Sequence, residues 1–417
     1  MMDTVLYCAS HENQTRMERL HSLKAVKTAL AYLEEDQENS ILEQIAIAET
    51  EAPTYFESKR AELYAEKLKE LGVQNVVIRS DGNVEGIIPG TESGTILMEG
   101  HLDTVFSFGT VKSIRRKDGV LYGPGIYDNA RGLSSILAML RALRMSGLKL
   151  RKSVIIAGTV EEENPGGLAG MKRLLDAHPE IEASINVDGG FIQGITYNAT
   201  YGRNVSYTFH GTGGHASGAF GLCANALSAA SRAVAKMSTI IVPDEPRTTF
   251  AATRMLTPLN CATTAIPSEC TLYVDYRSTD PVEFDKLGQQ LDACVQSGCE
   301  EETRFWAKDE ITFDKEIISE TPGGKQDIHS PLVEAHYLAG KSLGLEPFFR
   351  PGGSCNGNVA ISRGIPCVTA GAGEGNRKGH SLNEFFPEED AYRFPQGLLL
   401  LLLMAAGVDG AITSCID

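Results

Sequence analysis

The chain has 417 residues and a mass of 45.0 kDa, a length that favours two domains over one or four. Hydrophobic residues make up 42% of it and charged residues 22%, which is typical of a globular protein with a large core. With 38 basic and 54 acidic residues, the formal net charge is −16. That charge disfavours nucleic acid and an anionic membrane surface as partners.

The N-terminus and the cysteines bear on the location of the protein. The first 22 residues lack the apolar region of a secretory signal, and the longest apolar run, residues 398–406, is too short to span a membrane. The nine cysteines are scattered without CxxC spacing, which disfavours a disulfide framework and a cysteine-ligated zinc site. We therefore expect a cytoplasmic protein.

The first part of the chain alternates between helical and strand patterns. Helical periodicity covers residues 16–50 and 54–72, and the second stretch ends at a glycine. Further helices are predicted at residues 132–145 and 167–177, and buried strands at 76–79, 86–88, 95–98, 153–157 and 183–187. This alternation predicts an α/β sheet with helices on both faces.

The pattern changes near residue 199. Residues 203–210 and 269–276 alternate polar and apolar side chains with period two, which predicts an antiparallel sheet with helices on one side. A Thr-Pro-Gly-Gly segment at 321–324 marks a boundary, and a helix (332–343), a strand (366–370) and a helix (391–407) follow it. The predicted domains are a split α/β domain, 1–198 and 321–417, and an inserted α+β domain, 199–320.

Polar residues that could bind a ligand follow several of the predicted strands. His101 comes shortly after the strand at 95–98, and Asp103 stands two residues further on. Because ligands of α/β sheets gather beyond the carboxyl ends of the strands, such residues can converge in space. The Asp103 carboxylate could hydrogen-bond the second imidazole nitrogen of His101 and orient a metal-bound ring. Taken alone, a His-x-Asp sequence is also compatible with a histidine that binds no metal.

Other segments place carboxylates in similar positions. Asp128 lies in the glycine-rich loop YGPGIYDNARG and opens a predicted helix, so it fits either a helix N-cap or a ligand. A predicted buried strand is followed by three adjacent glutamates, Glu161, Glu162 and Glu163. They could form an acidic loop in solvent, or they could bind a dication that offsets the repulsion between their charges. The segments NVDGG and GHSLNE supply two further candidates, Asp188 and His380.

In their order along the chain, these motifs resemble those of the dinuclear zinc exopeptidase and amidohydrolase family. That family includes peptidase T, glutamate carboxypeptidase, acetylornithine deacetylase and succinyl-diaminopimelate desuccinylase. GHLDTV, GPGIYDNARG, the three-glutamate loop, NVDGG and GHSLNE carry the resemblance, which spans about residues 40–410. It implies a catalytic domain with a mixed sheet flanked by helices and an inserted lid and dimerisation domain. Residues 1–40 lie outside it, and we expect them to form a helical extension.

The resemblance implies a centre of two Zn²⁺ ions, with Co²⁺ or Mn²⁺ as alternatives. The implied ligands are His101 and Asp188 for one ion, Glu163 and His380 for the other, and Asp128 as the bridge. It also implies a cis peptide bond between Asp128 and Asn129. Matched to the family's acidic pair, Glu162 would be the general base, and Glu161 receives no chemical role.

The inserted domain carries further residues with implied roles. The segment GTGGHASGAFG resembles the family's lid motif, whose histidine reaches the site of the neighbouring subunit, so His215 would act in a homodimer. Arg277 would bind the α-carboxylate of the substrate, although a salt bridge at a strand end also explains it. Thr264 and Asn356 stand where the family commonly has Asn and Asp, and we expect both to bind substrate.

Together these features predict a metal-dependent exopeptidase that releases residues from short peptides. An N-acyl amino acid deacylase is the alternative within the family. A catalytically inactive, peptide-binding homologue is the alternative from another class, but Glu162 argues against it because a binder needs no base. A Rossmann oxidoreductase is disfavoured, since no GxGxxG follows the first predicted strand.

Overall fold

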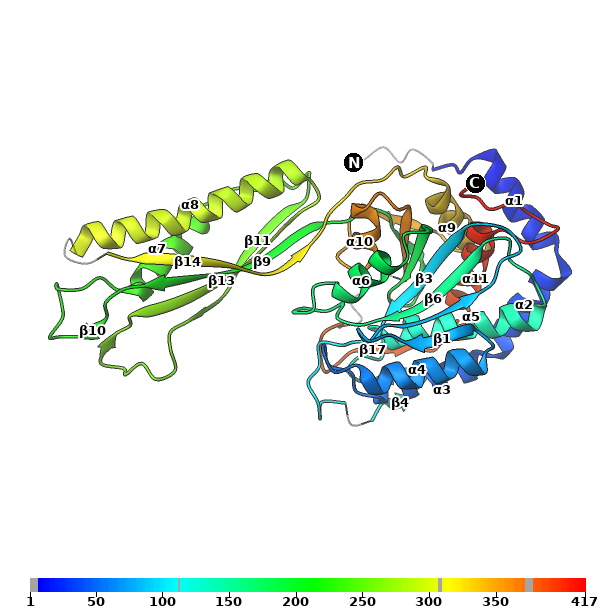
Figure 1. Cartoon of the computed structure of the whole chain (residues 1–417), viewed down its shortest axis with the longest axis horizontal. Coiled ribbons are helices and arrows are strands. Elements are labelled where there is room, and N and C mark those ends of the chain that lie inside the picture. Colours follow the sequence, from blue (N-terminus) through cyan, green and yellow to red (C-terminus); the bar gives the residue numbers. More distant parts are fainter. Residues whose placement is uncertain (1–6, 112, 307–309, 372–377) are drawn as a thin grey trace. The chain divides into compact units, whose positions relative to one another are not determined.

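The computed structural model describes residues 7–111, 113–306, 310–371 and 378–417. The chain forms two compact units, which Figure 1 shows with their helices and strands. The first unit comprises Met1–Ala199 and Gly324–Asp417, and the second comprises Thr200–Gly323.

The first unit is built on a mixed eight-stranded sheet in the order β1-β2-β6-β3-β7-β16-β8-β15. Strand β3 pairs in parallel with β6 and β7, and β7 pairs in parallel with β16, so the carboxyl ends of these four strands meet at one edge. A three-stranded sheet, β17-β5-β4, lies in the same unit. The strands are β1 (Gln74–Ile78), β2 (Val84–Ile88), β3 (Thr95–His101), β4 (Arg115–Lys117), β5 (Val120–Tyr122), β6 (Ser153–Thr159), β7 (Ile181–Val187), β8 (Phe191–Thr196), β15 (Phe348–Arg350), β16 (Cys367–Gly371) and β17 (Phe385–Pro387).

Helices cover both faces of the large sheet, because apolar side chains of β3 point alternately to one face and the other. Ile96 and Met98 of β3 join the main core with α5, α9 and α11, whereas Leu97 points to the other face and packs with residues of α6 and α10. The helices of this unit are α1 (His11–Ser22), α2 (Lys24–Glu35), α3 (Gln37–Glu49), α4 (Ser58–Glu70), α5 (Ala130–Ser146), α6 (Ala169–Ala177), α9 (Pro331–Ser342), α10 (Gly357–Ser362) and α11 (Arg393–Ala406). The predicted α/β class, with a mixed sheet flanked by helices, is confirmed.

The helical periodicity predicted over residues 16–50 does not correspond to one continuous helix. Residues 16–50 fall in three helices, and the backbone is extended at Leu23, between α1 and α2. The break at Leu23 lets α1 pack on α9 while α2 and α3 pack on α5. A single straight helix could follow only one of these surfaces.

The second unit has a four-stranded antiparallel sheet in the order β11-β13-β9-β14, and α7 and α8 pack on it (Figure 1). Buried and half-buried residues alternate along the whole of β13, so one face of the sheet carries the core of this unit. Strands β11 and β14 are mostly exposed, and their sequences show no such alternation. The elements are β9 (Tyr201–His210), β10 (Gly214–His215), α7 (Ala226–Met237), β11 (Thr248–Leu256), β12 (Ala265–Ile266), β13 (Glu269–Ser278), α8 (Pro281–Trp306) and β14 (Thr312–Thr321).

No helix within the described ranges has the length and apolar character needed to cross a membrane.

Candidate metal centre

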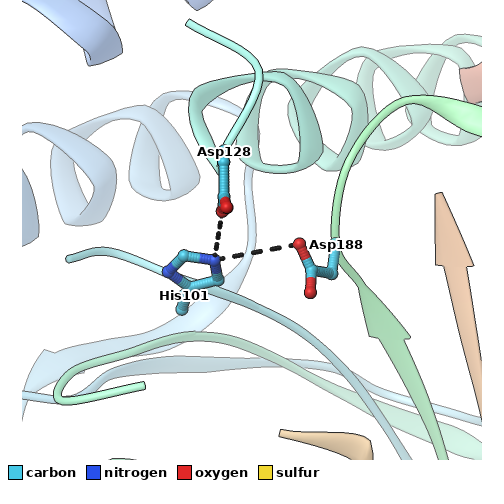
Figure 2. Close-up of side chains that lie close together, drawn as sticks. All are labelled: His101, Asp128 and Asp188. Atoms are coloured by element: carbon cyan, nitrogen blue, oxygen red, sulfur yellow. Dashed lines mark hydrogen bonds and ion pairs between the residues drawn. The ribbon is translucent and has the colours of Figure 1, made fainter. Parts of the chain in front are cut away.

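His101 is the last residue of β3, and its ring is held by contacts at both nitrogens. Nδ1 lies 3.1 Å from the backbone oxygen of Asp103, to which it donates as an N–H group. This bond leaves the lone pair on Nε2, which lies 2.9 Å from Asp128 Oδ1 and 3.9 Å from Asp188 Oδ1. Figure 2 shows Nε2 facing both carboxylates. The ring is therefore set in the tautomer that a metal ligand needs.

Asp128 precedes α5 and is not its N-cap. Asn129 caps the helix, because its Oδ1 accepts the N–H of Gly132 at 3.1 Å. The Asn129 side chain also donates to the backbone oxygen of Val187 at 2.8 Å, which ties the start of α5 to the end of β7. A side chain at position 132 would collide with Asn129, so glycine is required there. The peptide bond between Asp128 and Asn129 is cis.

Glu384 fixes the loop that carries Asp128. Its Oε1 accepts the backbone N–H groups of Tyr127 and Asp128, both at 2.7 Å, and its Oε2 accepts that of Gly125 at 3.0 Å. Burial raises the pKa of Glu384 to about 7, with the charge of Asp128 adding to the shift. The segment GHSLNE points to His380 and not to Glu384, since a carboxylate that binds distant backbone groups leaves no local pattern.

The glutamate loop after β6 is held by Asp103. Asp103 Oδ1 accepts the backbone N–H of Glu162 and Oδ2 that of Glu163, each at 3.0 Å. Thr54 donates its hydroxyl to Oδ2 at 2.9 Å. The Asp103 carboxylate lies 3.5 Å from His101 Nδ1, so it mainly positions this loop, and the backbone oxygen of Asp103 is the nearer partner of the ring. Neither Thr54 nor this loop contact was anticipated.

Glu161, the first of the three glutamates, has different contacts from the other two. The Glu161 carboxylate forms an ion pair with Arg173 at 2.9 Å, and its backbone N–H donates to Glu57 at 3.1 Å. Arg173 thus neutralises one of the three adjacent charges. A salt bridge within the protein, and not solvent or a dication, therefore balances the charge of Glu161, whereas the backbone N–H groups of the next two residues donate to Asp103.

His380 completes a second group of ligand atoms. Its Nε2 lies 3.0 Å from Glu163 Oε1 and 3.2 Å from Asp128 Oδ2. Asp128 therefore belongs to two groups, one with His101 and Asp188 and one with Glu163 and His380. Within each group the candidate ligand atoms all lie within 4.8 Å of one another. The structure thus brings together all five residues that the resemblance implies as ligands.

The electrostatics of this cluster show an excess of buried negative charge. Burial raises the pKa of Asp188 to about 7, and Asp128 adds to the shift. Burial also raises the pKa of Glu162 well above its usual value; the charge of His101 opposes this shift and that of Glu163 adds to it. Hydrogen bonds to Asp128 and Glu163 raise the pKa of His380 to about 11. Carboxylates that resist ionisation and imidazoles that retain a proton both indicate a site built for additional positive charge.

The donor set fits two dications. Two imidazoles and three carboxylates are ligands that Zn²⁺, Co²⁺ and Mn²⁺ accept, and the bridging position of Asp128 matches a pair of ions. Together with Glu162, the cluster has four carboxylates. When all four are ionised, two dications would balance their negative charge.

Three of the predicted site residues lie in the second unit. His215 ends β10, and its Nδ1 accepts the backbone N–H groups of Ser217 and Gly218 at 3.3 and 3.2 Å. Arg277 pairs with Asp275, at 2.9 Å from Nε to Oδ1. Thr264 is exposed, and its backbone oxygen accepts the N–H of Ala216.

Asn356 lies in the core of the first unit. It is 1% exposed, and its Nδ2 donates to Glu99 at 3.0 Å and to the hydroxyl of Thr159 at 2.7 Å. The amide thus bridges α10 to β3 and β6 beneath the ligand cluster. Cys355, next to it, is also buried, and burial raises the pKa of its thiol, so it is a packing residue.

Comparisons with known proteins agree with this geometry. The model of peptidase family M20/M25/M40 matches residues 97–403. Carboxypeptidase G2 of Pseudomonas sp. (strain RS-16) is 26% identical over 313 residues, which cover 72% of this chain and 73% of that protein. Among solved structures, a tripeptidase from Staphylococcus aureus has a TM-score of 0.73 and aminopeptidase PepT from Bacillus cereus one of 0.70. Both are 21% identical, with 88% of this chain and 97% of theirs covered.

The family model covers well over half of the chain, and its residues 97–403 include all five candidate ligands and Glu162. The chain belongs to peptidase family M20/M25/M40.

Proposed function

We propose that this protein is a metal-dependent exopeptidase that releases terminal residues from short peptides. The observation that carries the proposal is the sharing of Asp128 between two groups of three ligands, beside Glu162, which belongs to neither group. Such a site separates residues that hold ions from a carboxylate that can move a proton. The peptidases among its relatives support peptides as the substrate class.

The proposed cofactor is a pair of Zn²⁺ ions, with Co²⁺ or Mn²⁺ as alternatives. His101 and Asp188 would hold one ion, and Glu163 and His380 the other. When bound, such a pair polarises an amide carbonyl and acidifies a bound water.

Glu162 is the proposed general base. It takes a proton from the attacking water and gives it to the leaving amine, and an elevated pKa suits a group that must both accept and return a proton. The bond from its backbone N–H to the Asp103 carboxylate holds Glu162 in position. The same carboxylate also accepts the backbone N–H of Glu163. Asp103 thus sets the base and a ligand in one geometry.

His215 is the proposed donor to the developing oxyanion. Because its Nδ1 accepts two backbone N–H groups, the ring carries its proton on Nε2, which can donate. We propose that this donor serves the site of a second subunit in a homodimer, with the second unit acting as lid and dimerisation domain. Arg277 and Thr264 are the proposed contacts to the substrate, with the Arg277 guanidinium on the α-carboxylate.

A cytoplasmic location is also proposed. All nine cysteines lie within the described residues, and none of them forms a disulfide. This pattern suits a reducing compartment.

The test is a digest followed by mass spectrometry. Protein loaded with Zn²⁺ or Mn²⁺ would meet di- and tripeptides together with N-acetyl and N-succinyl amino acids, with a chelator-treated sample as control. Chelator-sensitive loss of one terminal residue supports the exopeptidase and shows which end it attacks. Release of acetate or succinate alone would identify a deacylase, and no turnover with two metals bound would identify a peptide-binding homologue.

A further inference from the structure

A pocket of about 770 Å³ lies in the first unit, between the hairpin of β4 and β5 and the segment 378–385. Three of its lining residues form a row across adjacent strands. Arg115 of β4 lies opposite Tyr122 of β5, and Tyr122 lies opposite Phe385 of β17. The volume falls within the range of pockets that hold small ligands.

The segments that form this pocket also carry candidate metal ligands. Lys378 and Asn383 line it, and His380 lies between them in the sequence. Pro124 lines it as well and belongs to the loop that leads to Asp128. Gly123, which also lines the pocket, donates its backbone N–H to the backbone oxygen of Glu384 at 3.0 Å, and the Glu384 side chain holds the loop of Asp128. The pocket is thus built from the segments that position Asp128 and His380.

The charged residues known to line the pocket are basic, although the chain has a net charge of −16. Arg115 and Lys378 line it, and no Asp or Glu occurs among the described residues that do so. The Arg115 guanidinium lies over the ring of Tyr122, 4.5 Å from its centroid. This stacking orients the planar group and leaves the N–H groups at its edge available to an anion.

Arg115 differs in its ion pairs from Arg116, the next residue of the same strand. Arg116 pairs with Glu38 at 2.7 Å and with Glu388 at 2.6 Å, so the protein itself neutralises it. Across the described part of the chain, Arg115 has no ion pair. Its charge is thus balanced by nothing that the described structure supplies.

We propose that this pocket binds the carboxylate side chain of an acidic residue in the peptide substrate. The proposal rests on the exopeptidase function and adds a preference for peptides that contain glutamate or aspartate. The paired N–H groups of Arg115 match a carboxylate, and the rings of Tyr122 and Phe385 cover the methylene groups. The pocket lies in the first unit, and Arg277 belongs to the second.

The first test compares tripeptides that differ only in charge: Glu-Ala-Ala, Ala-Glu-Ala and Ala-Ala-Glu against the same peptides with glutamine. We expect kcat/KM of the Zn²⁺-loaded enzyme to favour glutamate about tenfold at one position, as one charge-assisted hydrogen bond would give. The ratio should fall to near unity in Arg115→Gln. Because it is a ratio, a general loss of activity cancels.

The matched control is Lys117→Gln. Lys117 lies on the same strand and carries the same charge, but it is exposed, pairs with Asp118 at 3.8 Å and does not line the pocket. This variant should keep the preference of the wild type. A preference lost equally in both variants would mean that the general field of the hairpin, and not the pocket, selects the substrate, which would overturn the proposal.

The second test measures binding without turnover, by calorimetry of the same peptides on Glu162→Gln protein with and without Arg115→Gln. A preference for glutamate that Arg115→Gln abolishes supports the pocket even if the wild type hydrolyses none of the peptides, a result that would refute the exopeptidase alone. Equal affinity for glutamate and glutamine at every position overturns the pocket. Tighter binding of a phosphoserine tripeptide through Arg115 would also contradict a carboxylate as its ligand.

Discussion

Glu384 and Asp128 lie 256 residues apart in the chain, yet a Glu384 carboxylate oxygen accepts the backbone N–H of Asp128 at 2.7 Å. With the bonds to Tyr127 and Gly125, one buried side chain holds the whole loop that carries Asp128. The position of Asp128 therefore depends on the second chain segment of the first unit as much as on its own.

Glu384→Gln is expected to weaken Zn²⁺ affinity by roughly 10–100-fold, because the glutamine amide must direct an N–H group at a backbone N–H. Competition with a chromophoric chelator measures this affinity. Glu389→Gln, an exposed change of the same kind five residues later, is the control and should bind metal normally. Unchanged affinity in Glu384→Gln would show that the loop holds its shape without the carboxylate.

Asp103→Asn is expected to lower kcat by roughly 10–100-fold, since asparagine can accept only one of the two backbone N–H groups that Asp103 binds. The asparagine oxygen should replace Oδ2, which accepts from both Glu163 and Thr54, so the amide nitrogen faces the backbone N–H of Glu162. Metal content and KM should therefore change less than kcat, because it is the position of Glu162 that loosens. Steady-state kinetics with metal analysis measures both. Asp118→Asn, on the exposed hairpin, serves as the control, and a wild-type kcat in Asp103→Asn would remove its positioning role.

The proposed action of His215 in the site of a second subunit predicts complementation between two inactive variants. The His215→Ala chain keeps Glu162, and the Glu162→Gln chain keeps His215. In a mixed dimer, one site therefore has Glu162 from the first chain and His215 from the second, and is complete. We expect the mixture, after subunit exchange, to hydrolyse tripeptides faster than either variant alone. Exchange without any recovery would mean that His215 serves the site of its own chain or none.

Sequence patterns pointed to most of the ligand cluster for a physical reason. His101, Glu163 and Asp188 lie at or just beyond the ends of apolar strands, and parallel strands bring such ends to one edge. The density of glycine around Asp128 favoured a backbone held for a ligand, and Gly132, within α5, leaves room for the Asn129 cap. Local sequence could thus supply candidates, but each was ambiguous alone, and the set of five ligands came from the family resemblance.

The supporting contacts could not be anticipated in this way. Thr54 binds the side chain of Asp103, and Glu57 and Glu384 bind backbone N–H groups. These partners lie about 50 to 260 residues away in the chain, so such bonds depend on the finished fold. The edge strands β11 and β14 were missed because exposed strands carry no alternating apolar pattern. The breaks near Leu23 and Asp36 were missed because helical periodicity continues across them.

His336 gives the unfolding free energy a pH dependence of its own. It is fully buried, donates from Nε2 to the backbone oxygen of Ile192 at 3.0 Å, and burial lowers its pKa from 6.5 to about 4. Because the folded-state pKa is the lower one, the unfolded chain binds the proton first, and stability falls as the pH drops from about 6.5 to about 4. The loss amounts to about 3 kcal/mol.

Denaturant unfolding of the wild type and His336→Gln across this pH range isolates that contribution. The difference between the two unfolding free energies should shrink as the pH falls. His11→Gln, at the exposed start of α1, should follow the wild type. A difference that stays constant with pH would show that His336 does not resist protonation in the folded state.

The central claim is that metals and Glu162 together hydrolyse a peptide bond, and the kcat of Glu162→Gln protein with measured metal content tests it most directly. We predict full metal occupancy and a kcat lowered by about 10²–10⁴-fold for a tripeptide that the wild type cleaves. Glu161→Gln, which changes only the residue paired with Arg173, should retain most of its turnover. Substantial turnover by Glu162→Gln with both metals bound would contradict the account.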